Sequence, residues 1–355
     1  MSINPSRIFA GCALGLMIHL SALAETTVLL TIDTETRLGG SAREDLWGEL
    51  PNNPPIKYGV PFILDLLKRH QAKATFFVTP YEYVDAADIK DVTELIKQSD
   101  NSVQLHTHPA PMYGRLSMSS YDVATQREIL EKGKQMLESW SGETIVVHRA
   151  GAYSANHDTL DAAEMAGITA DASLAPAVAS PLFTEGATAN DVTRIKNIIE
   201  LPVTYYAQIR LFGFESLREL DIESSTEADI KKVISQMASE GACTVNIMMH
   251  SFSFTRHGKP DERIINRLEN ILEFISKQPN LRIATVPEFL ERYNTQRRTC
   301  NPAVHFVPVT GVFLTYLRAW ERLSEGGLNI MVALGPPLTL FLLMMVFVGR
   351  TLRRR

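Results

Sequence analysis

The residues best suited to chemistry are acidic and histidine side chains that follow short β-rich runs. Asp33 and Glu35 end one such run, and His106 and His108 end another. Residues two apart in a strand point to the same side, so each pair would share one site. One carboxylate of a pair can bind a metal while the other acts as a base, and two imidazoles at this spacing can bind one zinc ion. The pairs predict metal-assisted chemistry, with a solvated acidic loop and an exposed histidine turn as the alternatives.

Two further side chains are candidates for acid–base work. Arg149 precedes a glycine turn, and an arginine there can hold a carboxylate through two hydrogen bonds and keep it ionised. His250 ends the apolar run 245–249, and a histidine can act as a general acid near neutral pH. His148 would point away from Arg149 on a continuous strand, so we interpret it as structural. A surface arginine and a core histidine satisfied by the backbone are the alternatives.

The bulk composition excludes one large class of function. The 355 residues carry 35 Lys and Arg against 40 Asp and Glu, and the pI is about 6.0. Binding of nucleic acid needs clustered Lys and Arg, so we expect no nucleic-acid partner. The chain also lacks a G-x-S-x-G elbow and a phosphate-binding glycine loop. Metal-assisted chemistry is therefore the familiar catalytic pattern that the sequence favours.

Strand and helix patterns alternate between Glu25 and Tyr293. Apolar residues at helical spacing mark residues 58–70, for example, and β-rich runs mark residues 27–32 and 74–78. Repeated strand–helix units predict an α/β fold, and we expect a distorted (β/α) barrel with seven or eight strands. Barrels of this kind do chemistry at the carboxyl ends of their strands. The polar candidates fall at such ends: Asp33, His106, Arg149, Asp171 and His250.

The first residues have the form of a secretory signal. Arg7 precedes an uncharged apolar stretch, and residues 22–24 give the cleavage pattern Ala-Leu-Ala. We therefore predict a signal peptide at residues 1–24 and a mature domain at residues 25–294. An uncleaved anchor is the alternative.

The last residues predict a membrane anchor. Residues 326–349 hold no charged residue, which is long enough for a transmembrane helix. The arginine-rich tail 350–355 is expected in the cytoplasm, because positive residues favour that side. A connector at residues 295–325 would join the anchor to the domain on the outer side of a bacterial cytoplasmic membrane. A sorting signal that an enzyme removes is the alternative for the apolar segment.

Cysteine usage fits an exported domain. Cys12 falls in the predicted signal, so the mature chain keeps Cys243 and Cys300. An even pair in an exported protein suggests a disulfide, and we predict one between these two residues. Two unpaired buried thiols are the alternative.

Taken in order, the motifs resemble those of the polysaccharide deacetylases of carbohydrate esterase family four, the NodB-homology fold. The resemblance covers about residues 26–293. Its first motif, Asp33-Thr34-Glu35, has the D-x-D/E form of the family. The other matching segments are residues 64–78, 104–107, 149–153, 171–173, 249–252 and 284–290.

This resemblance implies a distorted barrel, a divalent metal that is usually zinc, and removal of acetyl groups from N-acetylated sugars. Carried over, Asp33 would be the base that activates water. Glu35 and His106 would bind the metal. Arg149 would hold Asp33, and His250 would protonate the leaving amine.

One position departs from the family pattern. The family usually has a second histidine four residues after the first, and Ala110 occupies that position here. A catalytic zinc needs about three protein ligands, so a third donor must come from elsewhere. His108 is the nearest candidate, and Pro109 could turn its imidazole inward. We therefore predict His108 as the third metal ligand.

The sequence as a whole predicts a metal-dependent hydrolase of N-acetyl groups on a polysaccharide, either an exopolysaccharide or a cell-wall glycan. The departure at Ala110 leaves open a non-catalytic glycan-binding protein on the same barrel. An amidohydrolase acting on a non-sugar amide is a further alternative, because barrels host many chemistries. The sequence points to a membrane and a glycan as partners, and to no particular protein.

Overall fold

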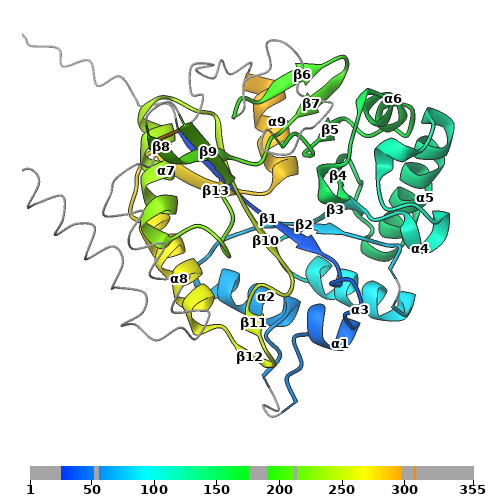
Figure 1. Cartoon of the computed structure of the whole chain (residues 1–355), viewed down its shortest axis with the longest axis horizontal. Helices are drawn as coiled ribbons and strands as arrows, with labels where there is room; N and C mark the ends of the chain where they lie inside the picture. Colours follow the sequence, from blue (N-terminus) through cyan, green and yellow to red (C-terminus); the bar gives the residue numbers. More distant parts are fainter. Residues whose placement is uncertain are drawn as a thin grey trace, which may run out of the picture.

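The computed structural model describes residues 25–51, 56–82, 84–175, 190–211, 214–296 and 307–308. These residues form a curled sheet with helices packed around it (Figure 1). The strand order is β10-β1-β2-β3-β4-β5-β7-β6, and β13 also pairs with β1. The strands of this sheet are β1 Thr26–Thr34, β2 Thr75–Val78, β3 Ser102–Thr107, β4 Val147–Ala150, β5 Ala170–Asp171, β6 Thr193–Ile195, β7 Ile198–Glu200, β10 Thr244–His250 and β13 Leu281–Ala284.

The strands run parallel, apart from β6, which pairs antiparallel with β7. In register, Asp33 of β1 lies opposite His250 of β10. His106 of β3 lies opposite Arg149 of β4. The carboxyl ends of these four strands therefore meet at one edge of the sheet and bring the polar candidates together.

Helices cover the sheet through apolar stripes. In α8 the buried residues Ile264, Leu268, Ile271 and Ile275 recur every three or four positions, which places them on one face. Side chains such as Asp122 and Thr226 cap helix N-termini by accepting backbone N–H groups. The helices are α1 Ala42–Asp45, α2 Val60–Arg69, α3 Ala86–Lys97, α4 Ala110–Tyr113, α5 Val123–Ser141, α6 His157–Met165, α7 Glu227–Ser239, α8 Glu262–Ser276 and α9 Val286–Gln296.

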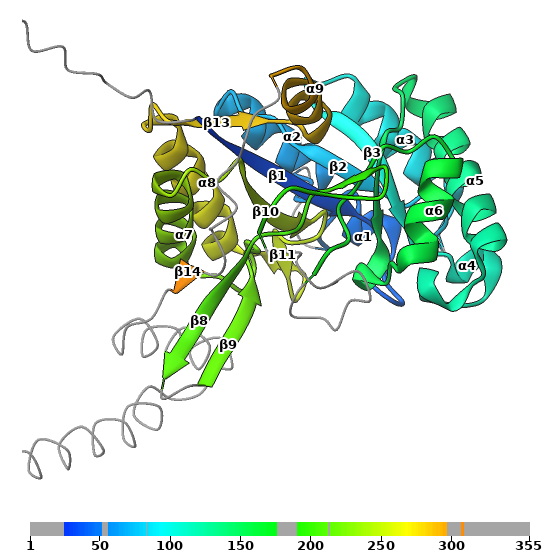
Figure 2. The same cartoon turned by 90° about the horizontal axis from the view of Figure 1, so that it is seen from above.

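A hairpin that the sequence did not predict extends from the body of the fold (Figure 2). It consists of β8 Tyr205–Leu211 and β9 Phe214–Glu219, which pair antiparallel. Strand β14, Val307–Pro308, adds to β8 from within the predicted connector. A smaller hairpin joins β11 Thr255–Arg256 to β12 Lys259–Pro260.

The predicted α/β class is confirmed, and the curled sheet agrees with a distorted barrel. Eight strands are parallel, namely β1, β2, β3, β4, β5, β7, β10 and β13. Among the described residues, no ladder joins β10 to β6. Instead, Thr204 donates its N–H to Asn246, and Met248 of β10 donates to Leu220, so the base of the hairpin lies along this edge.

The predictions on the termini fall outside the described residues. This holds for the signal at 1–24, the apolar segment at 326–349 and the tail at 350–355. Within the described parts of the chain, no helix is both long and apolar enough to cross a membrane. Cys243 is disulfide-bonded. Its predicted partner Cys300 is not among the described residues, so that pairing stays a prediction.

Candidate functional site

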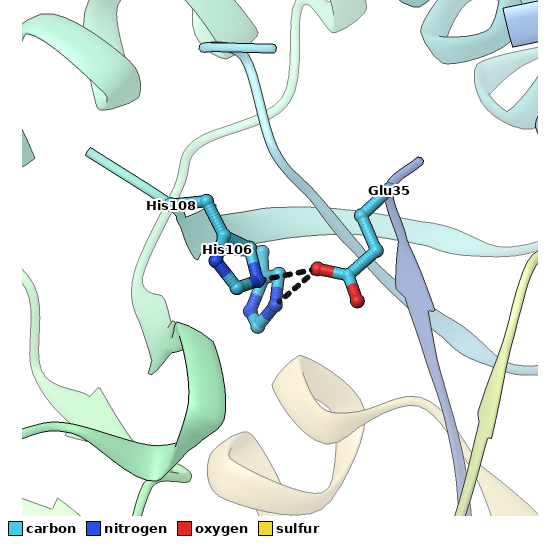
Figure 3. A group of neighbouring side chains, drawn as sticks. All are labelled: Glu35, His106 and His108. Carbon is cyan, nitrogen blue, oxygen red and sulfur yellow. Dashed lines mark hydrogen bonds and ion pairs between the residues drawn. The ribbon is translucent and has the colours of Figure 1, made fainter. Parts of the chain in front are cut away.

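Glu35, His106 and His108 converge at the carboxyl ends of β1 and β3 (Figure 3). Oε2 of Glu35 lies 3.1 Å from Nε2 of His106 and 2.5 Å from Nε2 of His108. One ligand atom from each residue lies within 4.8 Å of the others. The two imidazoles and the carboxylate that the sequence predicted as metal ligands thus surround a common point.

His106 is oriented by the neighbouring strand. Its Nδ1 lies 2.9 Å from the backbone oxygen of Arg149, which can only accept, so Nδ1 carries the proton. Nε2, on the side of Glu35, is then the nitrogen that would bind a metal ion. The side chain is 2% exposed, so this orientation is held by burial as well as by the hydrogen bond. Metal-bound histidines commonly donate their second nitrogen to a carbonyl in this way.

His108 lies just beyond the end of β3 and reaches the same point. Its ring meets the His106 ring edge-on, with centroids 4.9 Å apart. The space it occupies depends on Gly151, because a Cβ added there would overlap the His108 ring. The structure therefore brings His108 to Glu35, as the sequence predicted, whereas Ala110 lies in α4 and has no donor.

The charge of the cluster suits a cation. Burial tends to raise the pKa of Glu35, but hydrogen bonds and charge from His106 and His108 outweigh it and hold that pKa well below its usual range. An ionised carboxylate and two imidazole nitrogens are a donor set that zinc accepts. The residues present therefore fit a divalent metal ion.

Asp33 lies beside this cluster and is held from behind by Arg149. Nη1 of Arg149 donates to Oδ1 of Asp33 at 2.6 Å, and Nη2 donates to Thr31 at 3.1 Å. The guanidinium also lies 4.2 Å from the centroid of the Phe77 ring, and it is fully buried. Oδ2 of Asp33 faces the cluster, 3.8 Å from Nε2 of His106. Arg149 thus fixes one oxygen of Asp33 and leaves the other directed at the ligands.

His250 lies on the other side of Glu35. Its Nε2 is 3.8 Å from Oε1 of Glu35, and its Nδ1 is 2.8 Å from Oε1 of Glu223. Burial would lower the pKa of His250, but the hydrogen bond and charge of Glu223 raise it to about 9. The ring also stacks on Phe252 with centroids 4.8 Å apart. His250 is therefore held as an imidazolium with Nε2 directed at the site.

Sequence reasoning missed Glu223. This residue follows the β8–β9 hairpin and lies outside the parallel strands whose ends the motifs mark. Its Oε1 also accepts from Ser253 at 2.6 Å, so His250 and the serine three residues after it meet the same carboxylate. Recognition of the alternating pattern at residues 205–219 as a hairpin would have placed an acidic segment near His250.

Asp171 ends a strand as predicted, yet the structure places it away from the ligand cluster. Its Oδ2 lies 2.6 Å from Nδ1 of His148, and the other ring nitrogen lies 2.9 Å from Thr107 Oγ1. Glu200 belongs to the same buried group, and burial together with the charge of Asp171 raises its pKa well above the ordinary value. His148 is structural, as the sequence indicated.

A match to a protein family covers the first half of the sheet. Residues 24–170 match the polysaccharide deacetylase family, a region that includes Asp33, Glu35, His106, His108 and Arg149. This match agrees with the resemblance to that family that the motifs indicated. The family consists of hydrolases that act on the amide bonds of acetylated polysaccharides. His250 and Glu223 lie beyond the matched region.

Several solved structures resemble this chain at low sequence identity. A candidate polysaccharide deacetylase from Mycobacterium smegmatis is 19% identical, with a TM-score of 0.52 over 84% of this chain and 98% of that one. A CE4 family pseudoenzyme from Bacillus anthracis is 14% identical, with a TM-score of 0.42 over 76% of this chain and 66% of that one. Peptidoglycan deacetylase PdaC from Bacillus subtilis is 14% identical, with a TM-score of 0.41 over 77% of this chain and 94% of that one. No curated protein matches the chain.

Proposed function

We propose that this chain is a metal-dependent deacetylase that hydrolyses N-acetyl groups of an exopolysaccharide or a cell-wall glycan. One observation carries the proposal. Glu35, His106 and His108 converge, with Asp33 3.8 Å from His106 and His250 3.8 Å from Glu35. A base and an acid, each next to a metal site, are what amide hydrolysis requires.

The roles follow from the geometry of the side chains. A divalent metal held by Glu35, His106 and His108, which we expect to be zinc, would polarise the acetyl carbonyl and lower the pKa of water. Oδ2 of Asp33, left unbonded by Arg149, takes the proton of the attacking water. The water oxygen bonds to the acetyl carbon and the C–N bond breaks. His250, held by Glu223, gives its proton to the leaving amine, and acetate departs.

Acetate release from a panel of acetylated glycans tests this function. The full-length chain with zinc should release acetate from at least one N-acetylated polymer, and a chelator should stop the release. The Asp33→Asn variant serves as the control for contaminating activity. Absence of acetate from every polymer, or release that a chelator leaves unchanged, would overturn the proposal.

The location of the domain belongs to the same proposal and rests on the sequence. Residues 1–24 would export the domain, and residues 326–349 would anchor it in the cytoplasmic membrane. Protease added to spheroplasts should then digest the domain and spare a tag fused to the C-terminus. Loss of the tag to protease from outside would contradict the topology, and a tag absent from the mature protein would favour a removed sorting signal.

A further inference from the structure

A pocket of about 600 Å³ opens directly beside two of the proposed ligands, Glu35 and His108. Its walls come from the segment after β1, from Glu82, from α4 with the residues on either side of it, and from Phe252. His250 is not among the residues that line it, although the His250 ring stacks on Phe252. The pocket therefore continues the site on the side of His108.

The apolar part of this wall is exposed. Leu38 is 89% exposed and Leu116 is 66% exposed, and both line the pocket together with Ala110 and Pro111. Among the described residues, Leu38, Leu116, Ile56, Met112 and Met165 are the large hydrophobic side chains that lie open to solvent. Two of them thus gather at the mouth of one pocket. Burying this surface against an apolar ligand would be favourable, at about 25 cal/mol per Å².

The polar side chains of the wall are bonded to other protein groups. Both carboxylate oxygens of Glu82 accept from Thr36, one from its N–H at 3.2 Å and one from its hydroxyl at 2.9 Å. Nε of Arg37 donates to Asp45 at 2.8 Å. Sugar hydroxyls need hydrogen-bonding partners, because a buried polar group without one is costly. The pocket therefore suits an aliphatic group better than a sugar ring.

The site also has a direction. An amide has an amine side and an acyl side, and the proposed proton donor for the amine is His250. Oε1 of Glu35 faces His250, whereas Oε2 faces His106 and His108. With the amine and its sugar toward His250, the acyl group points toward His108 and the apolar pocket.

We propose that this pocket binds an aliphatic acyl group longer than acetyl, so that the enzyme removes such chains from the amino group of a sugar. The inference rests on the proposed function and names its substrate class. The hydrolysis of the longer acyl group forms and breaks the same bonds as the hydrolysis of an acetyl group. The water oxygen bonds to the carbonyl carbon, the C–N bond breaks, the amine takes a proton, and the longer carboxylate leaves.

A chain-length series tests the proposal. Chitosan oligomers carrying acetyl, butanoyl or hexanoyl groups are hydrolysed by the full-length zinc-loaded chain, and kcat/KM is measured for each. Each methylene that enters the pocket should raise kcat/KM by up to about fourfold, the factor expected for a fully buried methylene. The double variant Leu38→Ser, Leu116→Ser should remove this rise and keep acetyl hydrolysis. Met112→Ser is the matched control, since Met112 is 49% exposed on α4 and does not line the pocket.

Calorimetry on the metal-free chain gives a second readout. Hexanoyl oligomers should bind with a more negative heat-capacity change than acetyl oligomers, and the double variant should abolish the difference. Equal heat-capacity changes, or a kcat/KM that falls with chain length while acetyl is hydrolysed, would overturn the pocket proposal and leave the deacetylase intact. If no amide is hydrolysed, the proposed function fails, and the calorimetric comparison still shows whether the pocket binds the longer acyl chain. If the double variant lowers binding to lipid vesicles but keeps the chain-length rise, the leucines contact a membrane and the acyl proposal is overturned.

Discussion

Two groups of histidine and carboxylate side chains lie on neighbouring strands of one sheet, and they differ in how their hydrogen bonds are completed. In the first group, His106 and His108 direct their Nε2 atoms at a single oxygen of Glu35. In the second, each nitrogen of His148 has its own partner, Asp171 on one side and Thr107 on the other. In the first group three potential ligand atoms surround one point that a metal ion could occupy, whereas both ring nitrogens of His148 already have protein partners.

Exposure separates the two groups as well. The side chains of His108 and Glu35 are 29% and 14% exposed, whereas those of His148 and Asp171 are fully buried. A metal ion and a substrate can reach the first group but not the second. The same residue types therefore make a candidate metal centre in one place and a structural network in the other. The two groups differ in whether their ligand atoms converge on one point and whether solvent reaches them, and they do not differ in residue type.

The largest expected effect is on metal binding at the first group. His106→Ala and His108→Ala should each lower zinc affinity and acetate release by more than the roughly 10–100-fold typical of lost supporting contacts, since each removes a ligand. Equilibrium dialysis with zinc and an acetate assay measure the two effects. His70→Ala, at the end of α2, is the matched control. Full zinc content and full activity in His108→Ala would rule out that residue as a ligand.

Asp33 should show a different profile, because it is adjacent to the cluster and its oxygen is held by Arg149. Asp33→Asn should lower kcat by about 10²–10⁴-fold, the range for loss of a general base. Zinc binding by dialysis should stay within a fewfold of that of the unmodified chain. An Asp33→Asn variant that loses its zinc would make Asp33 a ligand instead of a base.

The second group should respond through stability. Asp171→Ala leaves Nδ1 of His148 buried without its acceptor, and removing one partner of a buried pair costs roughly 3–5 kcal/mol. Urea unfolding measures this loss, and zinc binding of the folded variant should persist. Asp161→Ala is the control, because Asp161 pairs with Lys196 at the surface and should change stability by about 0.5 kcal/mol or less. If Asp171→Ala kept the stability of the unmodified chain but lost zinc binding, the second group could not be called structural.

The smallest effect concerns Glu223 and the titration of His250. In the metal-free chain the pKa of His250 is raised to about 9, so this histidine stays protonated until the pH rises through that value. Glu223→Gln removes the largest influence that raises this pKa and leaves the burial that lowers it. The titration of His250, followed by NMR, should therefore move to lower pH. Glu227→Gln, on α7, should leave it in place, and an unchanged titration in Glu223→Gln would exclude Glu223 as its partner.

The sequence allowed the first group to be predicted because its members follow strands that are short, apolar and in a familiar order. The spacing of two residues at the end of β3 was sufficient to suggest that His106 and His108 share a site. Asp33 and Arg149 lie 116 residues apart. The meeting of the carboxyl ends of parallel strands predicted that both lie at one edge of the sheet, and the family resemblance implied their contact.

Other features could not be predicted because they depend on elements with weaker local signals. Glu223 follows an antiparallel hairpin, and no strand-end pattern marks it. Asp171 sits at a strand end like the site residues, but the depth of its burial is set by packing across the sheet. The pocket beside His108 joins segments from four parts of the chain, and its apolar mouth appears only once Leu38 and Leu116 are placed.

The coordination of zinc in the full-length chain tests the central claim most directly. X-ray absorption on the chain with one equivalent of zinc reports the number and type of ligands. We predict two imidazole nitrogens at about 2.0–2.1 Å together with oxygen ligands, and a loss of one imidazole in His108→Ala. A spectrum with two imidazoles that His108→Ala leaves unchanged, or one that changes in His148→Ala instead, would contradict the account.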